Sequence, residues 1–146
     1  MAEFADRKDD SFSNRYETML FLAGTNYDRI QSSPAWRSEH FVVQRAQLDL
    51  ADELTQIAVD VKSLSEIDDE LNGIAALMFD DATRAQVASR RSALDAVWTQ
   101  IVDRVAAIVR VADLVTRSED ELATMDIMAR AHRLDDRIDA LVARAG

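Results

Sequence analysis

Apolar residues recur through most of the chain in steps of three and four positions, which place their side chains on one face of an α-helix. From Leu54 to Leu64 these steps alternate as in the narrow seam of a coiled coil, and from Leu94 to Val115 the alternation continues without a gap. A third apolar stripe ends at Leu141, and its change of phase near residue 126 indicates a stripe that bends around neighbouring helices. The pattern predicts an all-α fold, because strands alternate with a period of two.

Turn and capping residues divide the first part of this pattern. Pro34 favours a helix that begins near residue 36, because proline is tolerated at the start of a helix and not inside it. A helix over 36–79 breaks either near 63–65 or at 72–73, where a capping-box match and an Asn-Gly pair occur. The turn to the next helix is therefore expected within 72–83.

A second interruption is predicted at 116–118, between the second and third long helices. Ser118 and Glu121 have the spacing of a capping box, and three acidic residues follow in the first turn, where they favour the helix dipole. The sequence therefore predicts a separate C-terminal helix that begins near residue 118.

These elements predict an antiparallel bundle of about three long helices, made of a long helical hairpin plus a C-terminal helix, with a short N-terminal helical segment. Three glycines and one proline in 146 residues argue against a sandwich or barrel, which needs many tight turns. We expect two parts, an aromatic-rich docking segment over 1–34 and the helical bundle over 35–146. A slender bundle has a high surface-to-volume ratio, so we also expect a homo-oligomer, namely a dimer.

The first forty residues form the expected recognition surface. Seven of the nine aromatic residues lie before residue 42, and aromatic side chains are strong anchors in protein interfaces. A short amphipathic helix is predicted over 13–23, ended by Gly24. The candidate interaction residues are Phe12, Tyr16, Met19, Leu20, Phe21, Tyr27 and Trp36. The segment either docks on another subunit or a foreign protein partner, or it caps its own bundle.

The charge of the chain excludes some partners. A net charge of −10, from 17 basic and 27 acidic residues, repels phosphate backbones and anionic lipid headgroups. We therefore expect no direct binding to nucleic acid and no membrane association. The N-terminus lacks the apolar core of a signal peptide, which favours a cytoplasmic location. Arginine outnumbers lysine by 15 to 2, a bias typical of GC-rich bacterial or phage genes.

Candidate catalytic groups are few. The chain has no cysteine, which excludes thiolate zinc sites and cysteine nucleophiles, and it has no glycine-rich phosphate loop. Glu66 and Asp69 match the E-x-x-D pattern of the all-α nucleotide pyrophosphohydrolases, which the chain resembles in size and class. That resemblance implies Mg²⁺ ligands at Asp49, Asp52, Glu53, Glu66 and Asp69, although Asp49-x-x-Asp52 has aspartates where those enzymes have glutamates.

A polar pair is expected inside the hairpin. Asp68 occupies the position seven residues after Val61, where an apolar residue is expected, and Arg91 interrupts the next apolar stripe. If the turn centres near residue 81, the two side chains either approach each other across the hairpin or turn outward. A partly buried ion pair would fix the register of the two helices.

A helical bundle without an assembled catalytic constellation is expected to be a non-enzymatic interaction or adaptor protein. It would act through self-association or through a helical binding face, without a cofactor. Two alternatives stay open. One is a small all-α Mg²⁺-dependent nucleotide pyrophosphohydrolase, and the other is an acidic decoy that inhibits a nucleic-acid-binding protein by occupying its groove.

Overall fold

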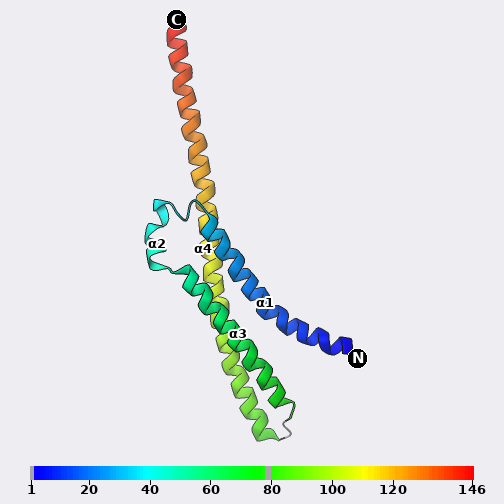
Figure 1. The fold of residues 1–146 in the computed structure, drawn as a ribbon. Helices are drawn as coiled ribbons and strands as arrows, with labels where there is room; N and C mark the ends of the chain where they lie inside the picture. The colour runs from blue at the N-terminus through cyan, green and yellow to red at the C-terminus, as the bar shows by residue number, and fades with distance from the viewer. Residues whose placement is uncertain (1, 78–79) are drawn as a thin grey trace.

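The computed structural model describes residues 2–77 and 80–146, with side chains from residue 15 onward within those ranges. Its elements are all helical: α1 (Ala2–Ser32), the 3₁₀ helix η1 (Glu39–Phe41), α2 (Val42–Gln47), α3 (Leu50–Ala75) and α4 (Asp81–Ala145) (Figure 1). No strand occurs in these described ranges, so the predicted all-α class is confirmed. Among the same residues, no helix combines the length and apolar character needed to cross a bilayer.

The hydrophobic core lies where α1 and α3 pack on the first half of α4 (Figure 1). Each helix contributes its apolar face, and the largest fully buried side chains are Ile30, Ile57, Val61, Ile101, Val105 and Val115. Arg104 of α4 pairs with Glu53 near the start of α3, and Arg91 with Asn72 near its end, so these two helices run in opposite directions.

The last side chain of α4 that packs against this core is Leu122. We call α1, the connector at 33–49, α3 and residues 81–122 of α4 the body. We call residues 123–145 of α4 the arm. Every side chain of the arm is exposed, and the arm extends α4 beyond the body for roughly 35 Å at 1.5 Å per residue (Figure 1).

The N-terminal element is longer than the short segment predicted. α1 has 31 residues and passes through Gly24, which was expected to end it. A glycine inside a helix costs only about 1 kcal/mol, and it has no positive φ here. Burial of Ala23 and Ile30 on the same face of α1 exceeds that cost, because both are fully enclosed by the body.

The predicted start of the first long helix near residue 36 is wrong. Trp36 and Phe41 turn into the core from the connector, which folds as a turn, η1 and α2. Arg45 fixes this connector by donating hydrogen bonds to the carbonyl oxygens of Trp36 and Ser38. The long helix begins instead at Leu50, where the Asp49 carboxylate accepts the backbone N–H of Asp52 at 3.0 Å.

The turn of the hairpin falls within the predicted range. α3 passes through both expected break points and ends at Ala75. Asp80 then caps α4 by accepting the backbone N–H of Thr83 at 2.7 Å and the hydroxyl of the same residue.

The predicted separate C-terminal helix is wrong, because α4 runs without a break for 65 residues. The hydroxyl of Thr116, inside the predicted interruption, donates to the Ala112 carbonyl at 3.0 Å and leaves the helix intact. Val115 lies in the core and Leu122 packs against it, so tertiary packing keeps this stretch helical and no new helix begins at Ser118.

Candidate interaction surface

Tyr16 is the best-packed of the candidate interaction residues on α1. Its ring meets Trp98 of α4 edge-on, with centroids 5.4 Å apart and planes at 88°. Its hydroxyl donates to the Asp68 carboxylate of α3 at 3.4 Å. Burial, and then the negative charge of Asp68, raises the pKa of Tyr16. Arg15 lies over the Trp98 ring at 3.7 Å from its centroid, so this cluster joins all three long helices.

The other candidates divide between the core and the surface. Trp36 is buried against Phe41, while Met19, Leu20 and Tyr27 are partly buried against the core. Phe21 stands outward with 74% of its surface exposed. Phe12 lies outside the described side chains. The segment thus contributes to its own body, and docking of this segment on a partner stays a prediction.

The acidic residues of the hydrolase alternative do not converge on one point. Asp49 caps α3, and Glu53 pairs with Arg104 of α4 at 2.8 Å. The other three, Asp52, Glu66 and Asp69, are exposed along α3. Among the side chains that the structure describes, no three carboxylates or imidazoles are close enough to share a metal ion. The alternative therefore gains no supporting geometry from the fold.

Arg104 is the main ionic link between α3 and α4. Its guanidinium donates to Glu53 and to Asp60, both at 2.8 Å, from a position about one third exposed. The hydrogen bond that Arg104 donates to the Glu53 carboxylate is the main cause that raises the pKa of Arg104. These groups form a structural pairing between α3 and α4.

The expected ion pair between Asp68 and Arg91 does not form. Arg91 donates to the Asn72 side chain, one turn further along α3, and Asp68 accepts from Tyr16. Both side chains are partly buried, so of the two open alternatives they turn inward, but each contacts a different partner. The packing of α1 explains why Asp68 does not pair with Arg91, because Tyr16 of α1 occupies the position beside the Asp68 carboxylate.

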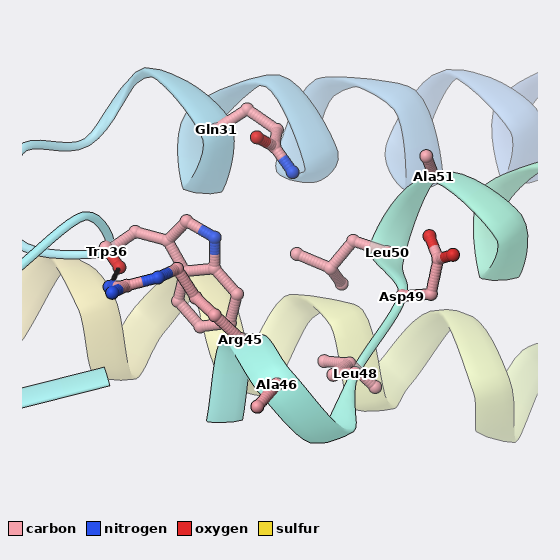
Figure 2. Close-up of a pocket in the computed structure, with 8 residues that line it drawn as sticks. All are labelled: Gln31, Trp36, Arg45, Ala46, Leu48, Asp49, Leu50 and Ala51. Atoms are coloured by element: carbon pink, nitrogen blue, oxygen red, sulfur yellow. Dashed lines mark hydrogen bonds between the residues drawn. The ribbon is translucent and has the colours of Figure 1, made fainter. Parts of the chain in front are cut away.

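A cleft of about 400 Å³ lies between the end of α1, the connector and the start of α3. Figure 2 shows Trp36 and Arg45 at one side, Asp49 at the other, and Gln31 above them. Arg45 is engaged with two carbonyl oxygens of the connector, and Asp49 with the first turn of α3. The charged groups that line the cleft, Arg45 and Asp49, are thus engaged in fixing the backbone, so the cleft is a structural feature of the connector.

The arm carries seven large hydrophobic side chains that are exposed along one stretch of helix. Its large exposed side chains are Met125, Ile127, Met128, Leu134, Ile138, Leu141 and Val142. The sequence marked part of this stripe by its spacing but predicted that neighbouring helices would cover it. That expectation is wrong for the described residues, because α1 and α3 do not cover α4 beyond Leu122. These residues are therefore the functional candidates that sequence reasoning missed.

Comparison with protein-family models, with curated proteins and with solved structures finds no match to this chain.

Proposed function

We propose that this chain is a non-enzymatic helical interaction protein whose binding element is the arm. The observation that carries the proposal is the stripe of apolar side chains along the arm. Ile127, Leu134 and Leu141 recur every seven residues, with half or more of each side chain open to solvent. Contiguous exposed apolar patches that are flanked by charged residues mark protein interaction sites.

The body supports this function by holding the arm at a fixed position. Because the arm and the α4 part of the body are one continuous helix, the direction of the arm is set by the packing of α1 and α3. Arg29 adds to this anchoring near the junction, where it donates to Thr116 at 2.5 Å and lies 3.5 Å from the Asp113 carboxylate. A rigid helix that presents one apolar face is a standard partner for another helix.

Photocrosslinking in the full-length chain tests the proposal. A benzophenone amino acid in place of Leu134 is expected to yield a covalent adduct with a protein, while the same group in place of Asp136 on the opposite face is not. The two positions are equally remote from the body, so the comparison isolates the stripe. Equal or absent adducts at both positions, in cells that express the chain at its natural level, would overturn the proposal.

A second measurement addresses catalysis. The purified chain with Mg²⁺ is expected to leave nucleoside triphosphates intact, since the acidic side chains of α3 are separately engaged or exposed. Turnover that disappears with Glu66→Gln, while the arm yields no adduct, would favour the hydrolase alternative.

A further inference from the structure

The apolar stripe of the arm has a heptad pattern with one consistent assignment. Positions d are filled by Ile127, Leu134 and Leu141, and positions a by Ala131, Ile138 and Ala145. A β-branched residue at a with leucines at the adjacent d positions favours two strands over three or four. The stripe therefore has the composition of one half of a two-stranded coiled coil.

The residues that flank the stripe distinguish between partner orientations. Within residues 127–145, every g position is an arginine: Arg130, Arg137 and Arg144. The e positions are Met128, Asp135 and Val142. In a parallel pair, a g residue meets the e residue five positions further along the partner helix. A second copy in register would thus place Arg130 opposite the partner's Asp135, twice by symmetry.

An antiparallel pair of arms would be opposed by the same residues. In that orientation g positions meet g positions, so arginine would lie against arginine at each contact of this edge. Like charges facing each other weaken a pairing and select against it. The charge pattern of the arm therefore favours two copies that run in the same direction.

The body leaves this face of the arm accessible. At 100° per residue, Leu134 and Ile138 lie about a quarter turn around α4 from Val115 and Ala112, which face α1 and α3. The side chains of the arm are exposed on all sides. A second helix can therefore lie along the stripe without displacing α1 or α3 from the core.

We propose that the occupant of the stripe is a second copy of this chain, joined through residues 127–145 as a parallel, in-register, two-stranded coiled coil. This rests on the proposed function of the arm and names its partner. The dimer places both bodies at the same end, on either side of the two-fold axis.

Cysteine crosslinking tests the orientation, because the natural chain has no cysteine and each variant carries a single thiol. Ile127→Cys and Leu141→Cys are each expected to form a disulfide-linked dimer, since identical d positions face each other across a parallel pair. Ala143→Cys, on the outer face, is the matched control and is expected to form no interchain disulfide, although the chain still dimerises. These positions are exposed, so the body keeps its fold, as the near-ultraviolet circular dichroism of the Tyr16–Trp98 cluster would report.

Two other crosslinking results would overturn the parallel dimer. In an antiparallel pair a positions face d positions, so Ala131 would lie opposite Leu141 of the partner subunit. The Ala131→Cys and Leu141→Cys chains would then crosslink when mixed and not when separate. If no pair forms a disulfide while a benzophenone at Leu134 captures a foreign protein, the arm is an interaction element and the second copy is wrong. If neither experiment yields an adduct, both the dimer and the proposed function fail.

A charge exchange tests the register independently. Asp135→Arg places an arginine opposite Arg130 of the partner subunit, and the dissociation constant is expected to rise about tenfold. Asp139→Arg makes the same charge change at position b, on the outer face, and is expected to change it less than about twofold. Adding Arg130→Glu to Asp135→Arg restores the opposite charges and the affinity. Equal weakening by both single variants, or no recovery in the double variant, would contradict the register.

Discussion

The two halves of α4 have a similar spacing of apolar residues, but they differ in what covers the apolar face. Before Leu122 the apolar seam is covered by α1 and α3, and Ile101 and Val105 are almost completely buried. After Leu122 a stripe of similar spacing is open to solvent. Periodicity therefore establishes that a helix has an apolar face, and it says nothing about which surface covers that face.

The arm stays helical without such cover for a local reason. Nucleation is the costly step of helix formation, and the arm continues a helix that the body has already formed. Alanine, leucine, methionine and arginine supply many of its residues, and these have high helix propensity. The i,i+4 pair of Arg130 with Asp126 at 3.0 Å adds a few tenths of a kcal/mol.

Amide hydrogen exchange gives the largest expected difference between the two halves. In dilute solution, amides of the body around Ile101–Ile108 exchange through opening of the core, while those of the arm exchange by fraying from Gly146. A gap of about 4 kcal/mol or more in opening free energy makes the arm exchange about a thousandfold faster. Mass spectrometry at rising protein concentration would then show slower exchange in the arm alone. Uniform protection along α4 in the dilute sample would contradict this.

A pair of matched truncations separates the halves by stability. Ile101→Ala removes a fully buried side chain and is expected to lower the free energy of unfolding by about 2–5 kcal/mol. Ile138→Ala makes the same chemical change on the arm, where 48% of the side chain is already exposed. Its effect in a dilute urea titration is expected to stay within about 0.5 kcal/mol. A comparable loss at both positions would mean that the arm is covered in the monomer.

The sequence predictions succeeded where local residues decide the structure, and they failed where burial against distant residues decides it. The hairpin turn and the helical class were predicted correctly from local rules. Asp80 caps a residue three positions away, and the apolar spacing from Leu94 to Val115 repeats in steps of three or four residues. The break near Ser118 and the end at Gly24 also follow from local rules, yet both were wrong. Burial of Val115 and Ile30 overrides the local preference there, and burial depends on residues distant in sequence.

The candidate site was harder to predict for the same reason. The aromatic residues of the first forty positions predict a docking surface, and two of them, Tyr16 and Trp36, are buried in the body, while docking of this segment on a partner stays a prediction. What distinguishes a core aromatic residue from an interface one is its neighbours, and Tyr16 reaches Trp98 and Asp68 across more than fifty positions. The arm, in turn, has the apolar spacing of a core helix, and only the fold shows that α1 and α3 do not cover it.

The ionic pairs give a smaller contrast between body and arm. Arg104→Met breaks two hydrogen-bonded pairs that join α3 to α4, and we expect a loss of about 1 kcal/mol at neutral pH. In dilute protein, where the chain is monomeric, Arg130→Met breaks one exposed pair within the arm and should cost about 0.3–0.5 kcal/mol at most. Thermal unfolding in low and high salt measures both, and salt should reduce the difference. A larger loss for Arg130→Met would indicate that its partner lies on another chain.

The smallest effect concerns pH at the start of α4. Hydrogen bonds from the Thr83 hydroxyl and backbone N–H lower the pKa of Asp80 below its value in the unfolded chain, which is about 3.9. The charged carboxylate therefore stabilises the fold above that value, and the stabilisation is lost as pH falls through the folded pKa. Asp80→Asn keeps a capping side chain without the charge, so its melting temperature should lie slightly below that of the natural chain at pH 7, and the difference should shrink as the pH is lowered towards 3. The cap belongs to the body, so Asp135→Asn on the arm is the control and should leave the monomer unchanged at both values. A difference between Asp80→Asn and the natural chain that stays constant from pH 7 to pH 3 would show that the cap does not depend on the charge.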